Sequence, residues 1–541
     1  MSAESAFPRE PRRQRTLTIG GTAYPLILPS IRDPRLHVAA VIITVHVLGQ
    51  VGLHFWVSVP QILAAILTCA ILEVAITFRQ SRAIVWPASA MLTGSGVALI
   101  LRVVGTPPGE PWSTYAWYVF AIVAGLSLLS KYVIRYQGSH VFNPSNIGLV
   151  VAFVVLGSTR VEPLDFWWAP LNSWMLAAYA VIIGGGLLIT RRLHLLALAA
   201  TFWVTLALGV GILAGSGHCM TARWAFAPVC GFDFWRVIVA SPEVLIFLFF
   251  MITDPKTVPA GRVGRVVFGF LVAVASTLLL APQTNEFGTK VGLLAGLVVV
   301  CASRPVLDRF LPEPRSAADE IGRFASRLAM GSVPHPGIVR GVARVALIVV
   351  AVSVVGVGIV VAGTPARGLV VPDTGELLSA VPHAVDPATL PAITVDVPAW
   401  DDTTAGPQSI AQDILVALAE DLELENQALL RADGSILTAV DHGDRLKEMQ
   451  GRLADAEASG RTVIAHYQFD AVHVVTIAPF GVQSGGSLGF ESQGIVTNET
   501  YDAAGTLLDR QTTPFSLTFA VRRPTGDRWM IVAALPPGSG R

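Results

Sequence analysis

Two polar, turn-forming segments, residues 137–145 and 251–259, lie between long apolar runs of this sequence. The first contains an Asn-Pro pair, Asn143 and Pro144, and the second an Asp-Pro pair that begins at Asp254. Proline removes a backbone donor and starts or stops helices. Because an unpaired polar group is costly in lipid, such breaks face a cavity or a ligand. We therefore expect the function of the protein to lie between these two segments.

Cationic side chains come shortly before Asn143. Lys131, Arg135 and His140 together form a set that is able to bind an anion. The alternative is that they anchor the inner end of a membrane helix, which we favour for Arg135. A lone histidine beside a turn is more often a hydrogen-bonding residue than a titrating one. Asn143 is the strongest candidate, because its amide offers both a donor and an acceptor at a helix start.

The second segment contributes Thr253 and Asp254. Asp254 is equally suited to capping the next segment by accepting hydrogen bonds from backbone N–H groups. We expect Pro87 and a Thr-Gly-Ser-Gly stretch that contains Thr93 and Ser95 to interrupt the third apolar span, and a Ser-Pro pair at Ser241 to interrupt the eighth. Paired broken helices predict a site near the middle of the bilayer, whereas close packing of small residues is the alternative explanation.

Other chemistry is less evident in the sequence. Glu243 and Arg236 lie two helical turns apart in the eighth span and are able to reach a cavity or each other, or to extend to the interface. No Ser/His/Asp, Cys/His or zinc-type spacing stands out, so we predict no catalytic and no metal-binding residues. The residues alone leave open whether the protein is an enzyme.

The composition is that of a polytopic membrane protein, with 52% hydrophobic and only 14% charged residues. From residue 366 onward, 11 Lys and Arg stand against 23 Asp and Glu, so an acidic part follows a basic one. The acidic part predicts no nucleic-acid partner. Cys219 and Cys230 share one polar loop, and a disulfide is allowed there if the loop lies outside the cell.

Eleven apolar stretches are candidates to cross a bilayer, which is therefore the first expected partner. Arg and Lys concentrate in alternate loops, which predicts a multi-pass protein of the cell membrane with a cytoplasmic N-terminus and an extracellular C-terminal domain. The first ten spans form two halves of five, so the second half is expected to be inverted. The spans are expected at residues 37–57, 60–78, 84–102, 114–133, 142–157, 173–190, 194–214, 235–253, 263–281, 288–303 and 343–363.

The C-terminal part predicts an α+β domain. Ser409 and Gln412 form a capping box for a helix over residues 410–430. A second helix is expected over residues 444–458, followed by strands at 461–468, 470–478, 487–498, 513–522 and 528–535. This order resembles nuclear transport factor 2-like and Tim44-like domains. The expected domains are a cytoplasmic basic arm (1–36), a ten-span membrane domain (37–303), a cytoplasmic linker (304–342), an eleventh transmembrane helix (343–363), an extracellular spacer (364–408) and the extracellular α+β domain (409–541).

Residues 37–312 resemble the NqrB/RnfD family, whose members are RnfD of the Rnf electron-transport complex and NqrB of the sodium-pumping NADH:quinone reductase. The matching positions are Lys131, Gly138 to Pro144, Phe249 to Pro255 with Pro259, and Arg304 to Asp308. The resemblance extends to the version of the family found in enediyne biosynthetic clusters. It implies a mostly α-helical, ten-helix inverted 5+5 repeat, similar to urea transporters, that binds flavin and transfers electrons among other membrane electron-transfer subunits.

The chain departs from the family at the flavin attachment site. Family members carry a Ser-Gly-Ala-Thr motif whose threonine is esterified to FMN, whereas the equivalent loop, residues 157–172, lacks this motif. The only threonine there, Thr159, is more often an ordinary loop residue. The resemblance therefore implies FMN or riboflavin held without a covalent bond. The candidate cofactor-binding residues are Asn143, Pro144, His140, Lys131, Thr253, Asp254, Thr93 and Ser95.

The leading interpretation is thus a flavin-linked electron-transfer component of the membrane. The alternative is a permease on the same fold, for a secondary metabolite or small solute, that has lost the cofactor. A third is a scaffold or export accessory. In each case the extracellular domain is a candidate for binding a protein or a small molecule.

Overall fold

The computed structural model describes residues 15–19, 21–53, 55–107, 110–163, 173–222, 224–330, 337–367, 374–396, 410–477, 486–524 and 528–539. It divides into two compact units, which are described separately below. The helical unit comprises residues 1–210, 236–280 and 290–359. The tail unit comprises residues 211–235, 281–289 and 360–541.

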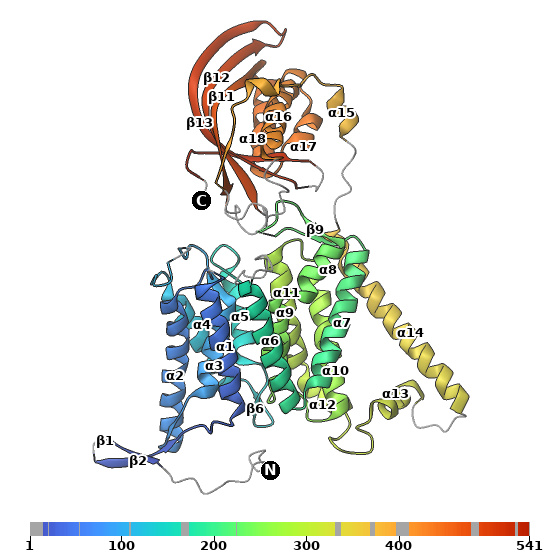
Figure 1. The fold of residues 1–541 in the computed structure, drawn as a ribbon. Helices are drawn as coiled ribbons and strands as arrows, with labels where there is room; N and C mark the ends of the chain where they lie inside the picture. Colours follow the sequence, from blue (N-terminus) through green and yellow to red (C-terminus); the bar gives the residue numbers. More distant parts are fainter. Residues whose placement is uncertain are drawn as a thin grey trace. The chain divides into compact units, whose positions relative to one another are not determined.

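Apolar helices dominate the first two thirds of the chain (Figure 1). Among the described residues, six spans are long and apolar enough to cross a membrane, one bent helix pair gives a seventh, and four shorter apolar helices lie at the remaining expected spans. The protein is therefore a multi-pass membrane protein. The helices are α1 (Pro34–Val51), α2 (Val59–Ser81), α3 (Ala88–Ile100), α4 (Trp117–Val133), α5 (Pro144–Leu156), α6 (Ser173–Arg192), α7 (Leu196–Gly215), α8 (Gly231–Ala240), α9 (Pro242–Ile246), the π-helix η2 (Phe247–Ile252), α10 (Arg262–Leu280), α11 (Glu286–Ala302), α12 (Arg304–Phe310), α13 (Ile321–Met330) and α14 (Gly337–Ala362).

Short strands join several of these helices. Strand β4 (Leu101–Val103) follows α3 directly and pairs with β7 (Val161–Pro163), which follows α5. The remaining strands of this part of the chain are β1 (Arg15–Ile19), β2 (Thr22–Ile27), β3 (Ile84–Val85), β5 (Arg135–Tyr136), β6 (Ser139–His140), β8 (Cys219–Met220) and β9 (Val229–Cys230).

The two expected helix interruptions have different outcomes. The eighth span does break at Ser241: α8 ends at Ala240, and the Ser241 side chain caps α9 by accepting a hydrogen bond from Val244 N–H. The interruption expected at residues 93–96 is wrong, because α3 runs without a break through this stretch. Helix α3 begins at Ala88, directly after Pro87, and ends at Ile100, close to the expected end of the third span, where β4 follows.

The glycines of α3 serve helix packing. A methyl group built on Gly94 would lie 2.5 Å from the Ala65 carbonyl oxygen and 2.8 Å from Ile66 Cα, both of which are backbone atoms of α2. Small residues let membrane helices approach this closely. The polar, Gly-rich stretch thus forms the close contact between α3 and α2.

Gly94→Ala is expected to destabilise the helical unit by about 1–3 kcal/mol, because a methyl group there must push two backbones apart. The measurement is the thermal unfolding midpoint of the full chain in detergent. Gly184→Ala in α6 is the matched control, since nothing lies within 4 Å of a methyl group at that position. Equal midpoints for the two variants would contradict the packing role.

One carboxylate of the linker caps a distant helix. Asp319, just before α13, accepts hydrogen bonds from Arg262 N–H at 3.0 Å and Val263 N–H at 2.9 Å, the first residues of α10. It also accepts one from Arg315 N–H at 3.1 Å. Although desolvation opposes the effect, these backbone donors lower the pKa of Asp319. The cap fastens the linker to the beginning of α10.

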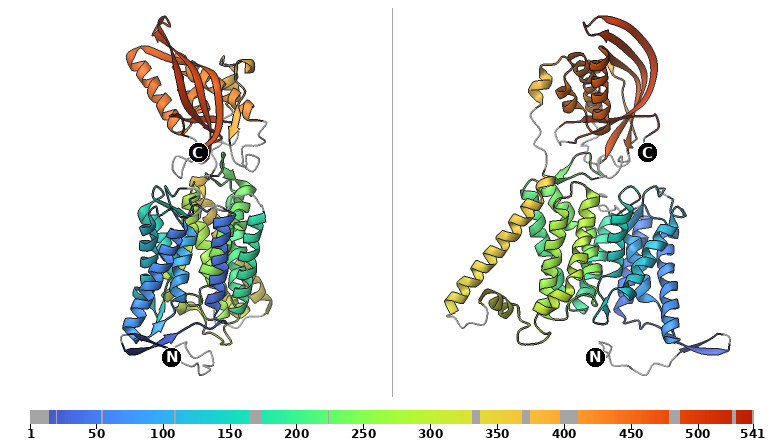
Figure 2. Two further views of the ribbon diagram at one scale, coloured as in Figure 1. Left: turned by 60° about the vertical axis from the view of Figure 1, so that its left-hand side comes forward. Right: turned by 180° about the vertical axis from the view of Figure 1, so that it is seen from behind.

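The tail unit contains a strongly curved five-stranded sheet, whose concave side faces α16 and α18 (Figure 2). The order is β10-β11-β12-β13-β14, in which β10 pairs in parallel and the other neighbours are antiparallel. The strands are β10 (Thr394–Asp396), β11 (Arg461–Ile477), β12 (Ser487–Asp502), β13 (Leu507–Arg522) and β14 (Met530–Leu535), and the helices are α15 (Gly375–Ser379), α16 (Ala411–Arg431), α17 (Gly434–Val440) and α18 (Gly443–Ser459).

The α+β tail agrees with expectation in order but differs in detail. The strands expected at 461–468 and 470–478 are one strand, β11, with a bulge between Phe469 and Ala471. Helix α17 was not expected. Of the capping box, Ser409 lies outside the described residues, while Gln412 bonds instead to Pro391 and Ile393 in the preceding segment.

Buried charges lie between the helices and the sheet of the tail. Arg445 of α18 donates two hydrogen bonds to Glu425 of α16, at 2.5 and 2.7 Å. The carboxylate of Asp421, one turn before Glu425, forms an ion pair with the guanidinium group of Arg528. Burial raises the pKa of Asp421 to about 8, and Arg528 opposes this effect. Burial and the neighbouring Glu425 also raise the pKa of Asp441. Folding of the tail therefore encloses carboxyl groups that resist ionisation.

The tail is expected to lose stability as the pH rises. The pKa of Asp421 rises from an ordinary 3.8 to about 8 on folding. The contribution of Asp421 to the stability of the tail is therefore fully present below pH 3.8 and is lost as the pH rises from there through about 8. The free energy of unfolding falls by up to about 1.4 kcal/mol per pH unit in that window. Asp421→Asn should flatten this dependence, measured as the urea midpoint for proteolysis of the tail at about pH 5 and about pH 8. Asp455→Asn, at an exposed position of α18, is the control and should leave the dependence unchanged.

Candidate functional site

The structure brings the two polar segments together. His140 Nε2 lies 3.1 Å from Asp254 Oδ2. Three residues further along the first segment, Asn143 Nδ2 donates to the Met251 carbonyl oxygen at 3.3 Å. Both contacts lie within the helical unit and link the start of α5 to the end of the π-helix η2. The two segments therefore contact each other, and a function located between them stays a prediction.

Asn143 is the N-cap of α5, as the sequence predicts, and Pro144 occupies the first helical position. The Asn143 side-chain oxygen accepts hydrogen bonds from Asn146 N–H at 3.1 Å and from the Ser145 hydroxyl at 2.9 Å. Asn146 in turn donates to the Leu294 carbonyl of α11 at 3.1 Å. These bonds join α5 to η2 and to α11 without exposing backbone groups.

The second segment is held by its own turns. The Thr253 hydroxyl donates to the Phe249 carbonyl at 2.5 Å, inside the π-helix. Asp254 Oδ1 accepts from Lys256 N–H at 3.1 Å, which is the backbone-capping role considered for it. Single-turn π-helices recur at functional sites. Here the π-helix places the Met251 carbonyl against Asn143.

Lys131, Thr93 and Ser95 lie in other contacts. Lys131 Nζ is 2.9 Å from Glu73 Oε1 of α2, and the same carboxylate accepts from Tyr132. Thr93 bonds to its own helix, and Ser95 Oγ lies 3.3 Å from His46 Nε2 of α1. Lys131, Thr93 and Ser95 thus bond to residues outside the two polar segments.

As these side chains stand, they do not form a flavin site. The Asn143 amide, the His140–Asp254 pair and the Lys131 ammonium group are each bonded to another group of the chain. A flavin would have to replace these bonds, because an isoalloxazine edge requires the same donors and acceptors. Among the described residues, no group of three or more His, Cys, Asp or Glu side chains is placed to hold a metal ion.

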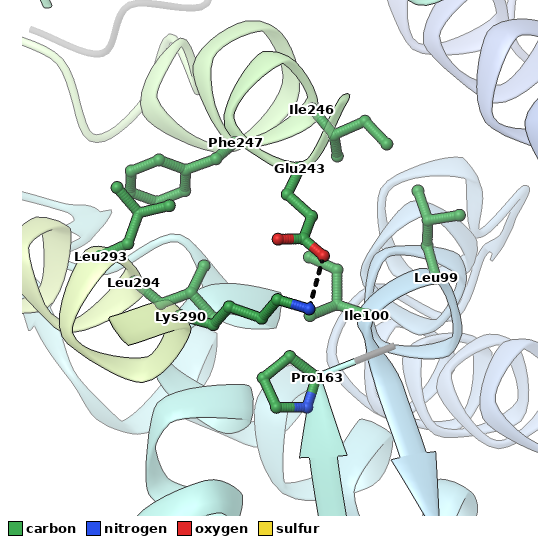
Figure 3. Close-up of a pocket in the computed structure, with 9 residues that line it drawn as sticks. All are labelled: Leu99, Ile100, Pro163, Glu243, Ile246, Phe247, Lys290, Leu293 and Leu294. Carbon is green, nitrogen blue, oxygen red and sulfur yellow. Dashed lines mark ion pairs between the residues drawn. The ribbon is translucent and has the colours of Figure 1, made fainter. Parts of the chain in front are cut away.

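A small cavity lies elsewhere in the helical unit, where broken elements meet (Figure 3). Within it, Lys290 Nζ of α11 lies 2.9 Å from Glu243 Oε1 of α9, and the two side chains are 8% and 17% exposed. The volume is about 30 Å³, which suits one or two water molecules and not a flavin. The other lining residues are apolar: Leu99, Ile100, Pro163, Ile246, Phe247, Leu293 and Leu294.

Helix breaks position the charges of this cavity. The Ser241-Pro242 break makes Glu243 a first-turn residue of α9, so the helix dipole favours its negative charge. Ile100, the last residue of α3, lines the same cavity as Lys290 (Figure 3). The break at Ser241 thus helps to stabilise an ion pair away from water.

The sequence identified only part of this arrangement. Glu243 was a candidate, but with Arg236 as its suggested partner. Lys290 was missed, although a lysine in the first half of an apolar span is itself a signal. A second buried pair was also missed, Arg102 to Glu162 at 3.0 Å, because it depends on the pairing of β4 with β7.

The many apolar helices, one of them broken, together with buried ion pairs define a multi-pass membrane protein. Comparison with known proteins confirms the resemblance to RnfD. The RnfD protein of the ion-translocating oxidoreductase complex of Klebsiella pneumoniae is 24% identical over 332 residues, 47% of this chain and 86% of that protein. The protein of the same name from Escherichia fergusonii is 24% identical over 330 residues, which are 48% of this chain and 87% of that protein. No family model matches the chain.

Removal of either charge at the cavity is expected to cost about 3–5 kcal/mol of stability, because the remaining partner stays buried. Glu243→Gln and Lys290→Met test this by thermal unfolding in detergent. The double variant should be less destabilised than the two single effects combined, since it leaves no unpaired charge. Additive losses would show that the two groups do not interact.

Proposed function

We propose that this chain is a membrane component of an electron-transfer complex, of the RnfD type. The similarity to two RnfD proteins, each named for an ion-translocating oxidoreductase complex, extends over most of their length and carries the proposal. The apolar, broken helices are consistent with it. The other electron-transfer subunits of such a complex are then its partners in the membrane.

The finer architecture is part of the same proposal. Ten spans would form an inverted 5+5 repeat, with a cytoplasmic N-terminus, and the tail would be an extracellular domain of the nuclear transport factor 2-like type. In support, the eighth span is broken, since α8 ends at Ala240 and α9 begins after Ser241. Broken helices of this kind occur in inverted repeats. The disulfide in the loop between α7 and α8 favours an extracellular position for that loop.

Non-covalent FMN or riboflavin stays a prediction within this function. It would supply one- and two-electron chemistry, while the chain would provide position and surroundings. The residues nearest to the meeting of the two polar segments, Asn143, His140 and Asp254, would hold it only after a rearrangement that exchanges their present bonds. An electron carrier of this kind requires no catalytic acid or base from the chain.

A permease is the second candidate, favoured by one observation. The Glu243–Lys290 pair closes a small apolar cavity between broken helices, which is the type of place where transporters bind solutes. An ion pair there would act as a gate that a polar solute opens. The two functions differ in whether the chain works within a complex or alone.

Purification of the full chain from its native membrane in mild detergent separates these functions. The electron-transfer proposal expects other redox subunits to co-purify, together with flavin detected by visible absorbance and by fluorescence after acid release. A chain that purifies alone and colourless, and that catalyses solute flux in vesicles, would overturn it in favour of the permease. Glu243→Gln should then abolish the flux, while Gly184→Ala, which meets no neighbour, should not.

A further inference from the structure

The loop between α7 and α8 is closed into a ring. Cys219 and Cys230 form a disulfide with a Cα–Cα distance of 4.3 Å, and β8 and β9 pair beside it. We call residues 219–230 the disulfide loop. The disulfide and the strand pair restrict the conformations of the residues between them.

One side of the disulfide loop is bonded to the sheet of the tail. Arg523 N–H donates to the Phe226 carbonyl at 2.7 Å, and Gly486 N–H donates to the Ala225 carbonyl at 3.1 Å. Gly486 comes directly before β12 and Arg523 directly after β13. Since these strands are antiparallel, the two donors lie at the same end of the strand pair. Two consecutive carbonyls of the loop thus meet two matched donors of the sheet.

The side chain of Phe226 belongs to the hydrophobic core of the tail. It is 3% exposed and clusters with residues such as Ile414 of α16 and Phe490 of β12. Its ring centroid lies 6.2 Å from that of Trp529. Burial of a phenylalanine among aliphatic and aromatic residues is a large contribution to any interface. The core of the tail is therefore completed by a residue that precedes helix α16 by more than 180 positions in the sequence.

The other side of the disulfide loop is fastened to segments that adjoin the apolar helices in sequence. Thr221 N–H donates to the Thr284 carbonyl and Glu286 N–H donates to the Thr221 carbonyl, both at 2.9 Å, so the loop pairs with the connection between α10 and α11. The residue just before the loop, His218, forms an isolated antiparallel β-bridge through its backbone with Arg367, which follows α14. All of these contacts lie within the tail unit.

We propose that the disulfide loop is the docking surface of the tail domain, with Phe226 as its anchor and the disulfide as the constraint that preorganises it. The partner of this surface is the tail of the same chain. The surface fits that partner because it combines one deeply buried aromatic ring with paired backbone hydrogen bonds, which is how anchors act at protein interfaces. The loop and the tail then lie on one side of the membrane, and that side is oxidising.

Hydrogen exchange of the full chain in detergent tests the anchor. Phe226→Ala should speed exchange about 100-fold at the Arg523 and Gly486 amides and at the adjoining ends of β12 and β13. Loss of the ring from the core loosens the loop whose carbonyls accept from these two amides. Phe232→Ala is the matched control, since Phe232 lies two residues after the loop but is 71% exposed. It should leave these peptides unchanged.

The disulfide is tested separately. Cys219→Ser with Cys230→Ser should speed exchange at the same peptides by less than Phe226→Ala does, since the ring remains but its preorganisation is lost. Phe226→Leu, which keeps most of the apolar volume, should likewise fall between wild type and alanine and guards against misfolding of the alanine variant. Exchange in Phe226→Ala that equals exchange in Phe232→Ala would overturn the proposal. Unchanged exchange in the serine variant would overturn the role of the disulfide.

Discussion

Every break in a membrane helix leaves backbone groups that water cannot reach, and this structure depends on how they are paired. Asn143 does this at the start of α5: its oxygen accepts from the next turn, and its nitrogen donates to the Met251 carbonyl at the end of the π-helix. Asn146 adds a bond to the Leu294 carbonyl of α11. Two short amide side chains thus hold α5, the π-helix η2 and α11 together.

The same constraint explains which expectations from the sequence succeeded. Hydropathy located a helix at each of the eleven expected spans, because burial in lipid demands long apolar runs. Asn143 and Ser241 were found as helix starts, because a capping side chain followed by proline is a local signal. The order of helices and strands in the tail could also be predicted, because hydrophobic periodicity is a local signal.

What failed depended on partners distant in sequence. The stretch from Thr93 to Gly96 reads as a break but is continuous helix, because its glycines meet the backbone of α2. Lys290 was missed because its role depends on the ion pair with Glu243, which lies 47 positions away in the sequence. No local pattern specifies that Phe226 enters the core of a domain that begins far along the chain.

The two units share a dependence on elements that reach across the sequence. The tail takes a core residue from the loop before α8, and the helical unit takes a helix cap from the linker before α13. Asp319 accepts a hydrogen bond from the N–H group of Arg262, which lies 57 residues earlier in the sequence. The ribosome has therefore already synthesised α11 and α12 before the first turn of α10 acquires its carboxylate. That boundary of the helix can therefore be completed only after the linker has been synthesised.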